Sequence, residues 1–262
     1  MTQPVDKNFI ALAERMADAA GDILRRHYRA PIDVERKSDA SPVTIADREV
    51  ETALRALIES HYPDHGIIGE EFGNVRGDSP FQWVLDPIDG TRSFIAGYPL
   101  FTTLIALAHE GTPILGLIDQ PILRERWLGT CHPGAGRDPL SRVRGGKALT
   151  LANAVLSTTS TDYFTPTQTQ QFLKLKSQAS SIILGGDAYA YAMLAEDRID
   201  IVADAGMKPY DFCALKCVVE NAGGTITDWQ GNPLTIHSDG NVLAAATKEL
   251  HAMALNFLLP SA

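Results

Sequence analysis

The sequence is poor in cysteine and has no long uninterrupted apolar run. Its 262 residues include only three cysteines, Cys131, Cys213 and Cys217, and so small and odd a number does not make a disulfide framework. Cys213 and Cys217 would share one face of a helix, but no further ligands of matching spacing lie nearby to complete a zinc site. The apolar segment 100–123 is interrupted by His109 and the residues after it. No stretch therefore reaches the ~20 apolar residues of a membrane span.

Positive charge is also scarce. The chain has 23 Lys and Arg against 32 Asp and Glu, which gives a formal net charge of −9 and a pI near 5.2. This balance argues against a nucleic-acid partner, because binding a phosphate backbone needs a basic face. It is compatible with cationic metals or a cationic substrate. Asp6 and Lys7 lie near an N-terminus with no continuous apolar core, so we expect no secretory signal and a cytoplasmic location.

What the chain does contain is typical of a globular protein with a sizeable core. Hydrophobic residues make up 45% of it and charged residues 21%, which are ordinary values. Apolar residues at helical spacing predict helices over 4–29 and 44–62. Two β-prone runs at 101–109 and 113–120, joined by Glu110-Gly111-Thr112, predict a hairpin.

The second half alternates between strands and helices. It follows a segment, 131–147, that is rich in Gly, Pro and Arg and that we interpret as an exposed loop between two subdomains. Predicted strands cover 154–159, 181–184, 199–203, 224–228 and 242–246, and predicted helices cover 165–177, 187–196, 210–222 and 248–258. Such alternation is typical of a layered α/β unit.

The most informative stretch is 83–94. Its first three residues, Trp83, Val84 and Leu85, predict a short buried strand that ends in Asp86 and Asp89, three residues apart around Pro87. Gly90 and Thr91 can then start a new element with free backbone N–H groups. Two carboxylates next to a group of N–H donors indicate a site that holds metal ions and an anion together. We interpret it as a metal-dependent phosphate site.

Three more acids could complete this site. Glu70 follows a short predicted strand at 66–69. Asp47 lies in a Thr44-x-x-Asp47 pattern, which is that of a capping box. Asp211 lies near the start of a predicted helix, where it could cap the helix or bind metal. Local sequence favours capping for Asp47 and for Asp211 and leaves metal-site roles open.

Two other motif interpretations fit the acidic stretch less well. The calcium loop of EF-hands has acids at every second position, whereas Asp86 and Asp89 are three residues apart. The haloacid-dehalogenase-type phosphatases carry Asp-x-Asp-Gly-Thr with a nucleophilic first Asp, and this chain has one extra residue between the acids. Both spacings count against those classes.

Taken together, these segments resemble the inositol monophosphatase superfamily of Mg²⁺-dependent phosphatases. Trp-Val-Leu-Asp-Pro-Ile-Asp-Gly-Thr at 83–91 matches its first signature, and 208–224, from Lys-Pro-Tyr-Asp to Glu-Asn-Ala-Gly-Gly, matches its second. Val-Thr-Ile-Ala-Asp at 43–47 and Gly-Glu-Glu at 69–71 match its upstream segments. The resemblance covers roughly 8–250, nearly the whole chain.

The resemblance implies an α+β or α/β fold, a layered α-β-α-β-α sandwich of the sugar-phosphatase type with two subdomains. The N-terminal subdomain, 1–145, would carry most metal ligands. The C-terminal subdomain, 146–262, would complete the metal and substrate site. The resemblance also suggests a homodimer.

The resemblance further implies two or three Mg²⁺ ions, for which Li⁺ would compete as an inhibitor. The implied metal ligands are Glu70, Asp86, the Ile88 carbonyl, Asp89 and Asp211. Glu70, with Asp47 and Thr91, would orient and deprotonate the attacking water. The N–H groups of Gly90 and Thr91 would hold the phosphate oxygens, and no covalent enzyme intermediate is implied. Asp47 and Asp211 thus match site positions, although either could also cap its helix.

The substrate is indicated by more variable positions. Arg92-Ser93-Phe94 and 185–191 differ from inositol phosphatases and resemble the histidinol-phosphate phosphatases of this superfamily. Histidinol carries a cationic amine and an imidazole, for which Asp187 and Asp204 would supply a counter-charge. Asp187 could instead cap its helix, and Arg92 could be solvated or contact the substrate or a partner subunit.

We therefore expect an Mg²⁺-dependent phosphomonoesterase that hydrolyses L-histidinol phosphate, a step of histidine biosynthesis. An inositol-1-phosphate or broader sugar-phosphate phosphatase is the alternative within this class. A non-catalytic metal- or phosphate-binding relative is the alternative from another class, and it is disfavoured because no implied ligand is replaced. The expected partner is a small phosphate ester, with no nucleic acid and no membrane.

Overall fold

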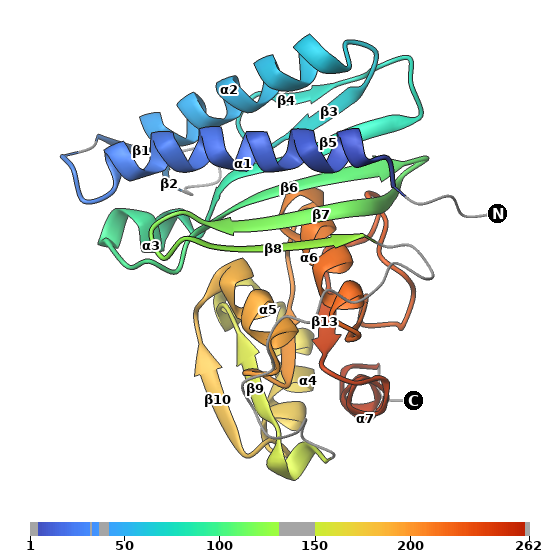
Figure 1. Ribbon diagram of the computed structural model, residues 1–262. Helices are drawn as coiled ribbons and strands as arrows, with labels where there is room; N and C mark the ends of the chain where they lie inside the picture. The colour runs from blue at the N-terminus through green and yellow to red at the C-terminus, as the bar shows by residue number, and fades with distance from the viewer. Residues whose placement is uncertain (1–4, 32, 37–41, 131–149, 260–262) are drawn as a thin grey trace.

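The computed structural model describes residues 5–31, 33–36, 42–130 and 150–259, and their helices and sheets stack in five layers (Figure 1). Two long helices, α1 (Lys7–His27) and α2 (Ile45–His61), lie side by side on one face of a six-stranded sheet. The order in this sheet is β4-β3-β5-β6-β7-β8. Its strands are β3 (Gly66–Gly69), β4 (Gly73–Val75), β5 (Phe81–Asp89), β6 (Thr102–His109), β7 (Thr112–Gln120) and β8 (Glu125–Thr130), and a separate small pair is formed by β1 (Val34–Arg36) and β2 (Pro42–Thr44).

Two central helices, α5 (Asp187–Ala195) and α6 (Pro209–Asn221), lie between this sheet and a second one (Figure 1). The second sheet has the order β10-β9-β11-β13-β12. Its strands are β9 (Val155–Thr158), β10 (Ser181–Leu184), β11 (Ile201–Asp204), β12 (Thr225–Thr227) and β13 (Val242–Ala245). The outer layer consists of α4 (Pro166–Lys176) and α7 (Lys248–Leu258). This confirms the predicted α-β-α-β-α sandwich.

The three apolar residues before Asp86 are buried, and between them they contact the helices on both faces of the first sheet. Trp83 and Leu85 pack among residues of α1 and α2, whereas Val84 packs among residues of α5 and α6. Successive strand residues point to opposite faces, so a strand covered on both sides is apolar without alternation. This explains why 83–85 form a continuous hydrophobic run.

Helix α6 lies unusually close to the first sheet at two glycines. A Cβ added at Gly116 on β7 would lie 2.2 Å from the carbonyl oxygen of Ala214, and one at Gly129 on β8 would lie 2.2 Å from that of Cys217. Only a residue without a side chain permits this approach. The close contact fixes α6, whose first turn carries Asp211, against the sheet that carries Asp86 and Asp89.

The turn between β6 and β7 is the predicted hairpin. His109 pairs with Thr112, which leaves a loop of Glu110 and Gly111 with φ of 49° and 78°. A type I′ turn requires positive φ at both central residues, and its backbone twist matches the right-handed twist of the two strands that it joins.

Some expectations differ from the structure or fall outside it. The strand predicted to end in Asp86 and Asp89 is β5, which ends at Asp89 but has an unpredicted register shift against β6 between these two residues. Pro87 cannot donate to the sheet, which accounts for the irregularity. The predicted loop 131–147 lies outside the described residues, and the division into subdomains at 145 stays a prediction. No helix in the described ranges is both long and apolar enough to cross a membrane.

Candidate active site

Three aspartates from two elements converge at the end of β5. Asp86 and Asp89 come from the strand, and Asp211 comes from the first turn of α6. One carboxylate oxygen of each lies within 4.8 Å of the others. The register shift after Asp86 allows two acids three residues apart to face one centre, which a regular strand would not. Asp86 is buried, whereas Asp89 and Asp211 are partly exposed, so the cluster is enclosed but reachable from solvent.

Glu70 joins this cluster from the neighbouring strand. Gly69, the last residue of β3, pairs with Leu85 in a parallel ladder with β5. Parallel strands end at the same edge of a sheet, so Glu70 comes to lie beside Asp86, to whose side chain it is hydrogen-bonded. The predicted convergence of Glu70 with Asp86, Asp89 and Asp211 is therefore present.

The electrostatics of the cluster favour a bound cation. Burial, followed by the nearby charge of Glu70, raises the pKa of Asp86 well above its usual range. Burial and the neighbouring acids do the same to the pKa of Asp89, and burial with Glu70 raises the pKa of Asp211 to about 7. Asp86 Oδ1 is buried without a hydrogen-bond partner among the described residues. Carboxylate oxygens are the donors that hard divalent cations prefer, so these residues fit a divalent metal ion.

This arrangement predicts that a divalent cation stabilises the protein more at high pH. A carboxyl group whose pKa is raised on folding stabilises the fold when protonated, and that contribution is lost as pH rises from about 4 through 7. A cation would replace the protons and remove this loss. We expect Mg²⁺ to raise the melting temperature more at pH 8 than at pH 5. An Mg²⁺-induced shift of the same size at both pH values would contradict this.

The segment after Asp89 turns directly into α3 (Thr91–Ala96). Gly90 has a φ of 82°, and a Cβ there would lie 2.8 Å from Asp187 Oδ2, so glycine meets both the backbone and the space requirement. The hydroxyl of Thr91 donates to the Ile88 carbonyl oxygen at 3.1 Å. A carbonyl oxygen has two lone pairs, so Ile88 keeps one for a metal ion.

Asp47 and Asp211 both make helix-capping contacts. Asp47 Oδ2 accepts hydrogen bonds from the backbone N–H and the hydroxyl of Thr44, each at 2.7 Å, at the start of α2. Asp211 Oδ2 likewise accepts from the backbone N–H of Lys208 at 2.6 Å. For Asp211, capping and membership of the acidic cluster thus coexist. For Asp47 the capping interpretation is confirmed, and its catalytic role stays a prediction.

Asp187 extends the acidic surface beyond the cluster. It is the first residue of α5, with a left-handed φ of 45°, and the N-cap position is Gly186. Its side chain is hydrogen-bonded to Ser93, and burial followed by the charge of Asp204 raises its pKa to about 6. Helix capping therefore does not account for this aspartate. The next residue, Ala188, donates its N–H to Asp89 Oδ2 at 2.6 Å.

Asp204 lies deeper than Asp187, at the end of β11. It is buried, and its Oδ1 accepts hydrogen bonds from the Thr158 hydroxyl at 2.8 Å and the Thr159 N–H at 2.7 Å. Its Oδ2 accepts from the Tyr191 hydroxyl at 2.9 Å. Both oxygens are thus engaged within the protein, which makes Asp204 a neighbour of Asp187 that anchors α5 to the second sheet. Its predicted contact with substrate is untested.

Arg92 lies close to both Tyr163 and Asp187. It is exposed on α3, and its guanidinium lies 5.9 Å from the ring centre of Tyr163. The same guanidinium lowers the pKa of Asp187 relative to burial alone. Sequence reasoning missed Tyr163, because it lies in a short 3-10 turn, Thr161–Tyr163, with no motif around it.

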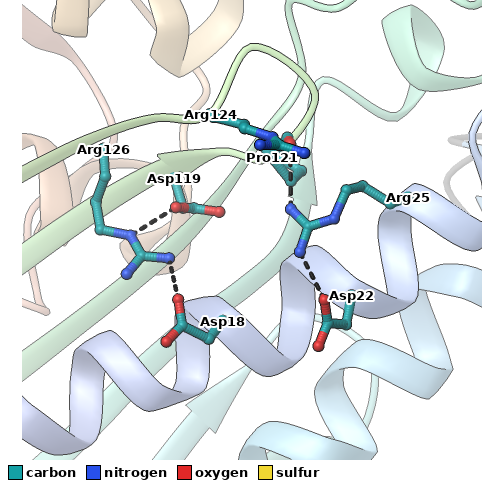
Figure 2. Close-up of a pocket in the computed structure, with 7 residues that line it drawn as sticks. All are labelled: Asp18, Asp22, Arg25, Asp119, Pro121, Arg124 and Arg126. Carbon is teal, nitrogen blue, oxygen red and sulfur yellow. Dashed lines mark hydrogen bonds and ion pairs between the residues drawn. The ribbon is translucent and has the colours of Figure 1, made fainter.

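A separate cavity lies between α1 and the ends of β7 and β8. It has a volume of about 540 Å³ and is lined by Asp18, Asp22, Arg25, Asp119, Pro121, Arg124 and Arg126. Arg126 bonds to Asp119 and Asp18, and Arg25 bonds to Asp22 (Figure 2). Most of its charges are therefore already paired with one another, and none of its lining residues belongs to the acidic cluster.

Known proteins match this chain along nearly its whole length. The sequence profile of the inositol monophosphatase family matches residues 6–258. The bifunctional phosphatase IMPL2, chloroplastic, of Arabidopsis thaliana is 43% identical over 264 residues, which is 95% of this chain and 75% of the plant protein. A histidinol-phosphatase of Streptomyces coelicolor is 36% identical over 259 residues, which is 95% of this chain and 96% of that protein.

Solved structures agree with this similarity. One described as an inositol monophosphatase from Zymomonas mobilis has 43% sequence identity and a TM-score of 0.86, and the match covers 98% of this chain and 99% of that one. The acidic cluster described above lies in the two segments that first indicated the resemblance. This chain belongs to the inositol monophosphatase family and is a phosphatase of that family.

Proposed function

We propose that this phosphatase uses Mg²⁺ to hydrolyse L-histidinol phosphate to L-histidinol and phosphate, as a step of histidine biosynthesis. The observation that carries the proposal is the position of Asp187, a carboxylate that lies outside the acidic cluster but next to it. It would supply a counter-charge to the amine of histidinol. The Streptomyces relative, which is described as a histidinol-phosphatase, supports the same substrate.

The ligands for Mg²⁺ would be Glu70, Asp86, the Ile88 carbonyl, Asp89 and Asp211. When bound, Mg²⁺ polarises a phosphoryl oxygen and lowers the pKa of a coordinated water. Glu70, which lies beside Asp86, would accept the proton of the attacking water. Thr91 and Asp47 would orient that water, and the N–H groups of Gly90 and Thr91 would hold phosphate oxygens.

The rest of the site would distinguish one alcohol from another. Asp187 is partly exposed, and its pKa of about 6 leaves it mostly ionised at neutral pH. A cationic amine would bind there by a charge-assisted hydrogen bond, whereas inositol is neutral and offers only hydroxyl groups. Arg92 and Tyr163 lie near Asp187, and a flat imidazole bound there could lie against the aromatic ring of Tyr163.

Phosphate release from L-histidinol phosphate and from inositol 1-phosphate tests this assignment. We expect a higher kcat/KM for L-histidinol phosphate. Asp187→Asn should lower that value about 10- to 100-fold, because a hydrogen bond to a charged group contributes roughly 1.5–3 kcal/mol. The same substitution should leave hydrolysis of inositol 1-phosphate nearly unchanged. Asparagine suits the position because it tolerates the left-handed backbone.

Comparable or better turnover of inositol 1-phosphate would favour the alternative function. That alternative, an inositol-1-phosphate or broader sugar-phosphate phosphatase, is supported by the similarity to the Zymomonas inositol monophosphatase.

We also propose a cytoplasmic homodimer. Light scattering of the purified chain at the mass of one subunit would contradict the dimer.

A further inference from the structure

Helix α2 carries a fully buried carboxylate that contacts the segment bearing Glu70. Glu51 has an exposed fraction of 0%, and it has no place in the phosphatase site described above. We propose that Glu51 is a positioning residue, which holds Glu70 in the metal site by binding the backbone that follows it. The inference rests on the proposed role of Glu70 as a metal ligand.

The Glu51 carboxylate accepts hydrogen bonds from two consecutive backbone groups. The N–H of Glu71 donates to Glu51 Oε2 at 2.7 Å, and that of Phe72 donates to Glu51 Oε1 at 3.1 Å. These are the two residues directly after Glu70. Hydrogen bonds to an ionised acceptor are about twice as strong as neutral ones, so this pair fixes the chain where it leaves the metal site.

Arg55, one turn further along α2, completes the arrangement. Its Nε donates to Glu51 Oε1 at 2.8 Å, and its Nη2 lies 2.7 Å from the same oxygen. Nη2 also donates to the Gly73 carbonyl, and the guanidinium lies 6.0 Å from the ring centre of Phe72. The ion pair therefore neutralises the buried charge and binds the same turn a second time.

Gly69 gives Glu51 the space that it needs. A Cβ at Gly69 would lie 2.1 Å from Glu51 Oε1 and 2.5 Å from Arg55 Nη2, so a larger residue would displace the pair. On its other side Gly69 is paired with Leu85 of β5. The residue before Glu70 is therefore held by β5, and the two residues after it are held by the ion pair on α2.

Mg²⁺ binding to the full-length protein, measured by calorimetry without substrate, tests the proposal. Outer partners of metal ligands typically contribute 10- to 100-fold to metal affinity, so Glu51→Gln should weaken Mg²⁺ binding by about that factor. Glu59→Gln makes the same chemical change at an exposed position of the same helix and should leave the affinity unchanged. Arg55→Lys keeps the charge but loses the planar fork, and it should weaken binding several-fold even if Glu51→Gln does not fold.

A double-mutant cycle separates positioning from a general loss of stability. If Glu51 acts through Glu70, then Glu51→Gln should cause no further loss of Mg²⁺ affinity in a Glu70→Gln background. Equal losses in both backgrounds would overturn the proposal, as would a lowered melting temperature with unchanged Mg²⁺ affinity. Failure of the unsubstituted protein to bind Mg²⁺ would overturn the metal assignment itself. The identity of the phosphate ester does not enter this experiment, so the substrate assignment fails or stands separately.

Discussion

Asp89→Asn should abolish nearly all phosphate release while leaving the fold intact. Asp89 contributes one of the three carboxylates within 4.8 Å of one another, and the substitution removes its charge without changing its size. Loss of several kcal/mol of transition-state stabilisation corresponds to a fall in kcat/KM of about 10³-fold. The measurement is phosphate release at saturating Mg²⁺, together with a thermal melt.

The thermal melt distinguishes loss of chemistry from loss of structure. The asparagine amide oxygen can still accept the hydrogen bond from the Ala188 N–H, and the repulsion that raises the pKa of Asp89 is removed. We therefore expect the metal-free variant to melt at the same temperature as the unsubstituted protein or higher. Asp22→Asn, at an exposed surface carboxylate, is the control and should retain full activity. Undiminished activity of Asp89→Asn would exclude Asp89 from the mechanism.

Gly116→Ala should both destabilise the protein and weaken its metal site. The added methyl group would lie 2.2 Å from the carbonyl oxygen of Ala214 and 2.8 Å from its Cα, and these backbone atoms cannot rotate away. Overpacking of this kind costs about 1–3 kcal/mol or more, which lowers the melting temperature by roughly 5 °C in a chain of this size. Displacement of α6 would also move Asp211 relative to Asp86.

The control for Gly116→Ala is Gly21→Ala. Gly21 lies within α1, and a Cβ there would meet only side-chain atoms, the end of the flexible Arg25 side chain at 3.0 Å and Pro121 Cβ at 3.3 Å. Alanine is favoured over glycine inside a helix by about 1 kcal/mol, which offsets the cost of these contacts, so this variant should lose much less stability than Gly116→Ala. A Gly116→Ala protein with unchanged stability and unchanged Mg²⁺ affinity would contradict the close packing of α6 on the sheet.

The acidic cluster could be predicted because its residues lie in motifs at the ends of recognisable elements. The apolar run before Asp86 and the helical pattern after Asp211 placed both acids beside loops, and the resemblance then assigned them to one site. Elements without such a pattern were missed. Strand β4 has three residues that are all exposed, so it has no burial pattern. The element expected to start at Gly90 and Thr91 is α3, but its six residues are too few to predict that it is a helix.

Contacts that depend on tertiary structure could not be predicted. Asp211 is a helix cap by its local pattern, and the resemblance assigned it to the metal site, but only the three-dimensional arrangement shows that it does both at once. Glu51 and Arg55 have the spacing of an ordinary ion pair on a helix, and nothing in that spacing indicates that the pair is buried beneath the Glu70 turn. The engagement of Asp204 by Tyr191 likewise needed the second sheet to form.

The rate of phosphate release from L-histidinol phosphate, measured against Mg²⁺ concentration, tests whether the acidic cluster serves hydrolysis by holding a divalent cation. The carboxylates concerned are those of Glu70, Asp86, Asp89 and Asp211. We expect negligible release after removal of divalent metal by a chelator, and a saturable recovery when Mg²⁺ is returned. A rate that is the same with and without Mg²⁺ would contradict it.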